Sequence, residues 1–316
     1  MRKLALSDEI LLKVDKAARY IGGEVNSVMK DKNAVDIRFA MCFPDVYEIG
    51  MSNLGMMILY NMFNQREDVW CERLFSPWPD LDKVMREQNI PLFALESQEP
   101  IRDFDFLGIT LGYEMCYTNI LQVLDLSGIP LKSADRGEDF PIVIGGGACA
   151  YNPEPLAPFF DLFYIGEGET VYDALFDAYK ANKKAGGSRR DFLLAAAKIP
   201  GIYVPSLYEV TYKEDGTIAS FAPTADGVPE KVQKQLIIDM EKEYRAVEAP
   251  VVPHIKATQD RVTLEIQRGC IRGCRFCQAG MIYRPTRERD VETLKESARI
   301  MLKNTGHEEI SLSSLS

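Results

Sequence analysis

The chain has 316 residues, of which 46% are hydrophobic and 27% charged, a composition typical of a globular protein with more than one core. Its formal net charge of -10 gives no indication that the chain as a whole binds nucleic acid or an anionic membrane. The N-terminus meets Ser7, Asp8 and Glu9 before an apolar signal region develops, and no apolar run is long enough for a bilayer, so we expect a cytoplasmic protein.

Strands and helices alternate in the first part of the chain. Residues 8–20 favour a helix, and the alternating apolar residues of 35–43 favour a strand. Further strand candidates, each followed by a segment that favours a helix, lie within 104–112, 140–150 and 161–169. This order predicts an α/β domain over residues 1–182, with a doubly wound, mostly parallel sheet covered on both faces.

The pattern of elements changes in the second half of the chain. Residues 183–249 combine one helical stretch with short strand candidates, and Asp215 and Gly216 favour a β-hairpin turn, so we expect a small α+β connecting subdomain. Residues 250–316 begin a second α/β unit. It has a strand that runs straight into a cysteine-rich loop, a helix over roughly 290–303 and another strand.

Three of the cysteines, Cys270, Cys274 and Cys277, lie on one short stretch at the end of the first strand of this second unit. Parallel α/β folds keep their reactive groups at that end of their strands. Thiolates are the ordinary ligands of iron-sulfur clusters, and four irons served by three thiolates leave one iron open to a substrate or cofactor. The remaining cysteines are widely spaced in apolar surroundings, so we expect them in the core.

A structural zinc site is the alternative interpretation of these three thiols. His254 or His307 would complete it. Zinc sites usually pair their ligands in two close clusters, however, and neither histidine has a second ligand at close spacing. The glycines and arginines between the cysteines argue against a third possibility, that the thiols merely fill a dry core.

The spacing C-x-x-x-C-x-x-C, with Phe276 before the last cysteine, resembles that of the radical S-adenosylmethionine (radical SAM) enzymes. The resemblance implies a (β/α) barrel, a 4Fe-4S cluster on the three thiolates and S-adenosylmethionine at the open iron. It also implies reductive cleavage of that cofactor to a 5'-deoxyadenosyl radical, with an electron donor such as flavodoxin or ferredoxin as partner. Phe276 would lie near the adenine, and Ser311 and Ser313 near the methionyl amine, although the family's usual Gly-Gly-Glu is absent there.

Arginines are concentrated around the cysteines, opposite in sign to the net charge of the chain. They are Arg261, Arg268, Arg272, Arg275, Arg284, Arg287 and Arg289. We expect them to face an anionic group such as a thiolate-ligated cluster or a carboxylate, although any one of them could instead lie on a solvated face.

The first domain, about residues 35–180, resembles the cobalamin-binding domain that is fused to many radical SAM enzymes. The segments "DVYEIGMSNLG", "LGITLGYE" and "VIGGGACAYNPEPL" followed by "DLFYIGEGE" carry this resemblance. It implies a cobalamin site formed by Asp45, Tyr47, Gly50, Thr110, Gly145, Gly146 and Gly147.

Tyr47 departs from the motif of that domain, D-x-H-x-x-G, in which the histidine ligates cobalt. A neutral phenol is a poor cobalt ligand at pH 7. Two alternatives follow: cobalamin binds without a protein ligand, or the domain has kept the fold and lost the cofactor. Glu167 and Glu169 in "GEGET" precede a helical run, and we assign them no acid-base role.

The segment after position 250 is far shorter than a full (β/α) barrel, which takes about 250 residues. We therefore expect a truncated chain that holds only the first part of the barrel and is inactive by itself. Three functions stay open: a radical SAM enzyme that performs methyl transfer or another radical modification on an unidentified substrate, a zinc-stabilised binding module, and a cobalamin-type docking domain without catalysis.

Overall fold

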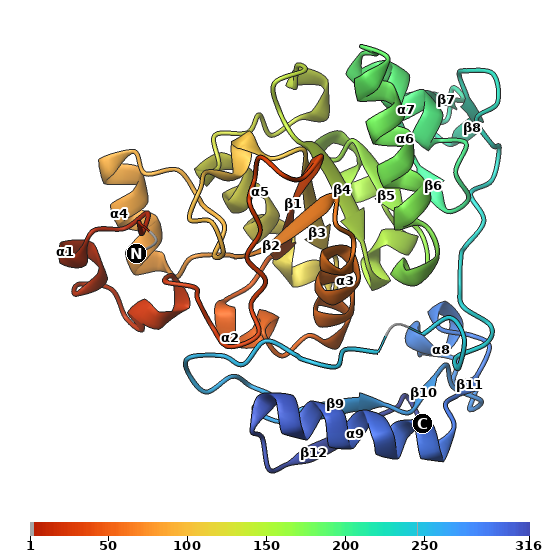
Figure 1. The fold of residues 1–316 in the computed structure, drawn as a ribbon. Coiled ribbons are helices and arrows are strands. Elements are labelled where there is room, and N and C mark those ends of the chain that lie inside the picture. The colour runs from red at the N-terminus through yellow and green to blue at the C-terminus, as the bar shows by residue number, and fades with distance from the viewer. Residues whose placement is uncertain (1–2, 245) are drawn as a thin grey trace.

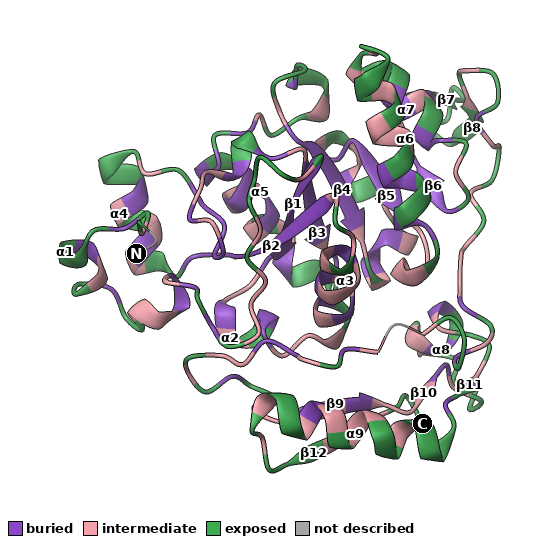
Figure 2. Cartoon of the chain, in the orientation of Figure 1, coloured by how far each residue is buried: buried purple, intermediate pink, exposed green. Residues whose placement is uncertain are grey.

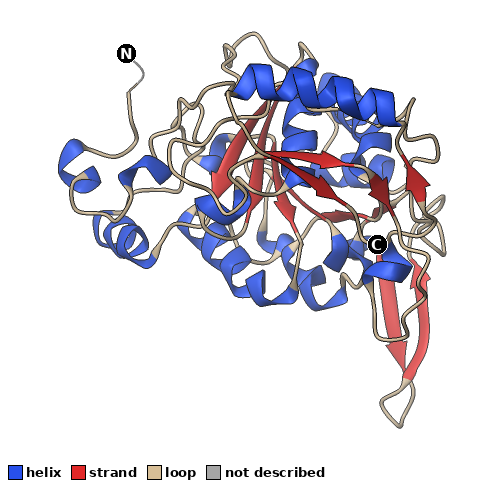
Figure 3. Ribbon diagram, turned by 90° about the horizontal axis from the view of Figure 1, so that it is seen from below, coloured by secondary structure: helices blue, strands red, loops and turns tan. Residues whose placement is uncertain are grey.

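The computed structural model describes residues 3–244 and 246–316. They form one large sheet with helices on both faces and a smaller βαβ unit below it (Figure 1). Viewed from below, the smaller unit lies across the end of the large sheet (Figure 3). None of the helices in the described ranges has both the length and the apolar character needed to cross a membrane.

The large sheet has the strand order β2-β1-β3-β4-β5-β6. Its strands are β1 (Ile37–Phe43), β2 (Val69–Phe75), β3 (Phe106–Thr110), β4 (Ile142–Gly146), β5 (Leu162–Tyr164) and β6 (Ile202–Tyr203). The first five are parallel and β6 is antiparallel to β5. The order 2-1-3-4-5 is that of the flavodoxin-like doubly wound fold, so the predicted fold class is confirmed.

Both faces of this sheet are buried, as expected for parallel strands (Figure 2). On one face lie α3 (Leu54–Gln65) and α6 (Tyr172–Lys184), where Phe39 packs against Phe63 with ring centroids 4.9 Å apart. On the other face, α4 (Pro79–Gln88) and α5 (Tyr117–Leu126) cover a second core. The side chains of β1 alternate between these two cores.

The first domain extends beyond residue 182, where we expected it to end. α7 (Arg189–Ala196) begins with a capping box formed by Ser188 and Asp191. Phe192 of this helix packs against Tyr179 with ring centroids 5.2 Å apart, and β6 then adds a strand to the edge of the sheet. The start of the predicted connector, α7 and β6, is therefore part of the first core.

The helix predicted over residues 8–20 is wrong for most of its length. Only α1 (Asp8–Leu11) and a 3-10 turn form there, and Lys16, which precedes the 3-10 turn, adopts a left-handed backbone conformation that a continuous helix would not allow. α2 (Tyr47–Gly50) is also a single turn. The 3-10 turns are η1 (Ala17–Arg19), η2 (Ile101–Asp103), η3 (Glu114–Cys116), η4 (Ser133–Asp135), η5 (Ala148–Tyr151), η6 (Glu154–Phe159), η7 (Gly168–Thr170) and η8 (Pro205–Leu207).

The connecting segment contains the predicted β-hairpin. β7 (Tyr208–Tyr212) and β8 (Ile218–Pro223) are antiparallel, and Gly216 takes a positive φ of 81° in the turn between them. The chain then returns to the first domain, where Gln235 forms an isolated bridge with Gly166.

The C-terminal unit has the predicted order of strand, cysteine loop, helix and strand. β9 (Val262–Glu265) and β12 (Ile310–Ser313) are parallel neighbours, joined through α9 (Val291–Thr305). Between β9 and α9 lies an antiparallel ribbon of β10 (Gln267–Arg268) and β11 (Arg287–Glu288), with α8 (Ala279–Ile282) in the loop between them. Asp290 caps α9, because its carboxylate accepts the amide hydrogen of Glu292 at 2.8 Å.

Candidate functional site

A cavity of about 570 Å³ lies between the carboxyl ends of the large sheet and the C-terminal unit. It lies beside the carboxyl ends of the neighbouring strands β1 and β3, whose following helices, α3 and α5, cover opposite faces of the sheet, and doubly wound sheets bind ligands at such a point. Its inner wall is apolar and is formed by Phe39, Met41, Ile58, Leu59, Ile109, Ile144 and Tyr172. The cavity therefore suits a ligand with an apolar end that packs against the sheet.

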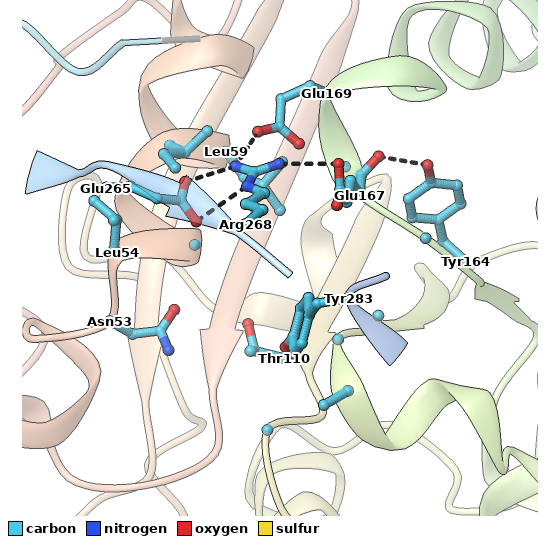
Figure 4. A pocket seen from close by; sticks show the side chains of 18 of the residues that line it. Asn53, Leu54, Leu59, Thr110, Tyr164, Glu167, Glu169, Glu265, Arg268 and Tyr283 are labelled. Carbon is cyan, nitrogen blue, oxygen red and sulfur yellow. Dashed lines mark hydrogen bonds and ion pairs between the residues drawn. The ribbon is translucent and has the colours of Figure 1, made fainter. Parts of the chain in front are cut away.

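Polar groups surround the mouth of this cavity (Figure 4). Asn53 caps α3, with its side-chain oxygen 2.9 Å from the Met56 amide nitrogen. Thr110 ends β3, and Ser313 and Ser314 reach the cavity from β12 and the residue after it. Hydroxyl and amide groups thus stand at the opening while the interior stays apolar.

The three glycines that end or follow β4 differ in what they face. A side chain at Gly146 would meet no heavy atom closer than the Tyr172 hydroxyl at 3.9 Å, so this position borders open space in the cavity. Gly147 has a positive φ of 110°, and a Cβ there would lie 2.9 Å from the Leu111 carbonyl oxygen. Gly145 faces away from the cavity, against Phe163.

Tyr47, at the position of the cobalt-ligating histidine, does not line the cavity. Its side chain is 1% exposed and packs against Phe75, and its hydroxyl donates to Glu24 Oε1 at 3.0 Å. Glu24 is paired in turn with Arg73 at 2.7 Å. Burial, together with the nearby Glu24 carboxylate, raises the pKa of Tyr47 well above its usual value, so the phenol is neutral.

The other two residues of this loop also have structural contacts. Asp45 accepts hydrogen bonds from the hydroxyl of Tyr113, which lines the cavity, and from the Val46 amide. Gly50 is packed so closely that a Cβ would lie 2.2 Å from the Phe75 ring. Of the residues assigned to a cobalamin-type site, Thr110, Gly146 and Gly147 line the cavity, and Asp45, Tyr47, Gly50 and Gly145 do not.

The cysteine loop runs from β10 to β11, and both of its ends line the cavity, through Gly269 and Tyr283. A Cβ at Gly269 would lie 2.4 Å from the Pro285 carbonyl oxygen, so the two ends of the loop touch there. The thiols of Cys270, Cys274 and Cys277 are partly or fully exposed and form no disulfide.

The thiols are not gathered into a metal site. Throughout residues 3–244 and 246–316 there is no cluster of three or more His, Cys, Asp or Glu side chains that could hold a metal ion. His254 instead contacts the Gly22 carbonyl oxygen at 3.2 Å, and His307 lines a separate small pocket. Three unpaired thiols on one loop are nevertheless the donor set that a 4Fe-4S cluster with one open iron uses.

Of the residues expected around S-adenosylmethionine, one lines the cavity and the others do not. Ser313 lines the cavity, whereas Ser311, one pleat earlier on β12, does not. Phe276 lies on the cysteine loop with 93% of its surface exposed. Arg272 and Arg275 are exposed near the thiols, but Arg268, Arg287 and Arg289 are buried.

An acidic turn after β5 reaches the base of the cysteine loop. Arg268 Nη1 lies 3.2 Å from Glu167 and Nη2 lies 2.6 Å from Glu169 (Figure 4). Glu265 completes the set, 2.9 Å from Nη2. Burial opposes the charge of Arg268, but Glu169 and Glu265 outweigh it and raise the pKa of the guanidinium. In the sequence, Glu167 and Glu169 look like favourable charges at a helix start, so their contact with the second unit was missed.

Residues 55–205 match the family described as "Radical SAM proteins, N-terminal". An uncharacterized protein of Methanocaldococcus jannaschii is 27% identical over 256 residues, which cover 81% of this chain and 44% of that protein. The chain thus spans less than half the length of this curated relative.

Two solved structures are similar in fold. The cobalamin-dependent S-adenosylmethionine radical enzyme OxsB, with aqua-cobalamin bound, superimposes with a TM-score of 0.50 at 18% identity, covering 89% of this chain and 34% of that chain. The radical S-adenosylmethionine methyltransferase TsrM of Kitasatospora setae, with cobalamin and a 4Fe-4S cluster bound, gives 0.48 at 13% identity, covering 89% and 48%.

Residues 55–205 are therefore similar to the N-terminal domain of radical SAM proteins. The resemblance expected from the sequence, to radical SAM proteins with a cobalamin-binding-like domain, is confirmed.

Proposed function

We propose that this chain is part of a radical SAM enzyme, in which Cys270, Cys274 and Cys277 hold a 4Fe-4S cluster and S-adenosylmethionine is cleaved reductively. One observation carries the proposal. A loop with three unpaired thiols begins and ends at a cavity beside the carboxyl ends of the large sheet, in a chain whose residues 55–205 match the radical SAM N-terminal family. A cluster held by these thiolates would supply the electron for cleavage of a carbon-sulfur bond of the sulfonium.

The chain's own residues would bind and orient the cofactor. The three cysteines ligate as thiolates, so loading the cluster releases protons. Ser313 and Ser314 present hydroxyls at the cavity, suited to the methionyl amine and carboxylate. The exposed guanidinium groups of Arg272 and Arg275 stand near the thiols, where they would ease the negative charge of the reduced cluster.

A corrinoid is the second cofactor that we propose, in the cavity between the two units. The apolar inner wall suits its nucleotide end, Gly146 and Gly147 allow close approach of the backbone, and Thr110 offers a polar contact. Tyr47 is committed to Glu24, so the corrinoid would bind without a ligand from that loop. The reaction would be a methyl transfer or another radical modification, driven by an electron donor of the flavodoxin or ferredoxin type.

Anaerobic reconstitution with iron and sulfide tests the cluster. We expect about four irons per chain, and almost none in Cys274→Ala. Cys42→Ala is the matched control, because Cys42 is a buried cysteine of β1 in the core of the large sheet, and it should leave the iron content unchanged. A chain that takes up one zinc and no iron would instead be the zinc-stabilised module.

Titration with aquocobalamin, followed by its absorption spectrum, tests the corrinoid. Gly146→Leu should weaken binding at least about tenfold, because Gly146 lines the cavity, a Cβ there has room, and the larger side chain would occupy space that the ligand needs. Gly137→Leu is the control, since Gly137 is exposed with no heavy atom within 4 Å of a Cβ. If the parent chain binds no corrinoid, the docking-domain alternative is favoured.

A further inference from the structure

The cysteine loop is closed at its base by two buried arginines. Arg268 in β10 and Arg287 in β11 are direct partners in the antiparallel ribbon, and both are buried. Two guanidinium groups in such a ribbon repel each other, and each needs a carboxylate to compensate for lost water. An acidic side chain that pairs with both arginines would therefore keep the base of the loop closed.

Both arginines bind the same carboxylate, which comes from the first domain. Glu167 lies 3.2 Å from Arg268 Nη1 and 2.8 Å from Arg287 Nη1. Its Oε2 also accepts the Ile237 amide hydrogen at 3.0 Å. Arg268 has two further acidic partners, but across the described part of the chain Glu167 is the acidic side chain that pairs with Arg287.

The backbone fixes Glu167 in place. Gly166 takes a positive φ of 144°, and a Cβ there would lie 2.2 Å from the Gln235 carbonyl oxygen. That oxygen accepts the Glu167 amide hydrogen at 3.0 Å, and the Tyr164 hydroxyl donates to the Glu167 carbonyl oxygen at 2.6 Å. A Cβ at Gly168 would lie 2.5 Å from the end of the Leu59 side chain, which could shift, so the backbone restraint on this glutamate comes from Gly166.

Arg287 transmits this restraint into the loop itself. Its Nη2 donates to the Tyr283 carbonyl oxygen at 3.0 Å and its Nε to the Pro285 carbonyl oxygen at 2.9 Å. Pro285 in turn contacts Gly269, the residue before Cys270. The carboxylate of Glu167 is thus connected to both ends of the segment that carries the thiols.

We propose that Glu167 is a positioning residue: its carboxylate holds Arg268 and Arg287 together and thereby sets the arrangement of the three thiols beside the cavity. That this arrangement suits a 4Fe-4S cluster rests on the proposed function. The ion pairs of Glu167 with Arg268 and Arg287 do not depend on that function, because they form in the metal-free chain.

Hydrogen exchange and thiol alkylation of the metal-free chain test the restraint. In Glu167→Gln, Arg287 loses its acidic partner while Arg268 keeps Glu169 and Glu265. We therefore expect amide exchange over residues 283–289 to rise about tenfold, with a smaller rise over 265–268 and none in β1 to β4. Iodoacetamide should alkylate the loop cysteines of Glu167→Gln at a different rate from those of the parent chain. The buried core cysteines should stay unreactive in both.

Two variants of the same kind serve as controls. Glu288→Gln removes an exposed carboxylate of the same ribbon that takes no part in these ion pairs, and it should behave as the parent. Glu167→Asp keeps the charge and should restore most of the protection over 283–289. If Glu167→Gln exchanges like Glu288→Gln in this segment, or loosens the whole sheet equally, the positioning role is refuted.

Reconstitution separates this proposal from the proposed function. If the parent chain takes up no iron, the proposed function fails, and the exchange experiment still decides the restraint. If the parent holds a cluster, Glu167→Gln should bind several-fold less iron or give an altered electron paramagnetic resonance (EPR) line shape. An identical iron content and spectrum in both would show that Glu167 does not position the thiols.

Discussion

The substitution Tyr47→Phe separates a structural role of this tyrosine from a role in cofactor binding. It keeps the ring that packs against Phe75, with ring centroids 5.3 Å apart, and removes the hydroxyl that donates to Glu24 at 3.0 Å. Glu24 is buried, so no water is at hand to replace the lost donor.

The expected loss of stability follows from the charge of the acceptor. Glu24 remains paired with Arg73 at 2.7 Å, so the substitution removes one hydrogen bond and leaves no isolated buried charge. Hydrogen bonds to charged groups contribute about 1.5–3 kcal/mol, and we expect the free energy of unfolding to fall by an amount in this range.

Urea unfolding followed by circular dichroism measures this loss. Tyr212→Phe is the matched control, because Tyr212 is an exposed residue of the β7–β8 hairpin and its change should cost almost nothing. Corrinoid affinity should be the same in parent and Tyr47→Phe, since Tyr47 does not line the cavity. Unchanged stability combined with weaker corrinoid binding would refute the structural assignment of Tyr47.

Two further predictions concern Glu48 in α2 and Gly166, which follows β5. Burial opposes the ionisation of Glu48, but hydrogen bonds from Arg19 and Lys16 outweigh it and lower the pKa of Glu48 from 4.5 to about 2. The ion pairs of Glu48 therefore stabilise the fold fully above pH 4.5, and this stabilisation is lost as the pH falls toward 2. Glu48→Gln should reduce the difference in urea midpoint between pH 6 and pH 3; an unchanged difference would contradict the ion pair. Gly166→Ala should destabilise the protein more than Gly186→Ala, because of these two positions only Gly166 would place a Cβ against backbone, 2.2 Å from the Gln235 carbonyl oxygen. Gly186→Ala should cost about 1 kcal/mol for its positive φ alone. Equal melting temperatures of the two variants would argue against the close approach at Gly166.

The sequence was most informative where strands are apolar on both faces. The strands that become β1, β3, β4 and β5 were expected from their apolar runs, and the alternation with helices predicted the doubly wound sheet. β2 was missed because Glu72 and Arg73 interrupt its apolar pattern. Both charges are buried and paired, Glu72 with Arg38 and Arg73 with Glu96, each at 2.6 Å. Their partners come from other elements, so local sequence could not reveal them.

The same limit applies to the site. The cysteines, Thr110 and two of the glycines could be identified because their spacing or composition is local. Tyr47 could be recognised as an unusual residue, but its burial depends on Glu24, which lies outside the first loop. The contact of Glu167 with Arg268 and Arg287 joins segments about a hundred residues apart in the chain, and no periodicity or motif encodes such a pairing.

The central claim is that one iron of a three-thiolate cluster is left open for S-adenosylmethionine. EPR of the anaerobically reconstituted, dithionite-reduced chain tests it most directly. We predict a 4Fe-4S signal that changes on addition of S-adenosylmethionine and is absent in Cys274→Ala. A chain without an iron signal, or a signal that S-adenosylmethionine leaves unchanged, would contradict the account.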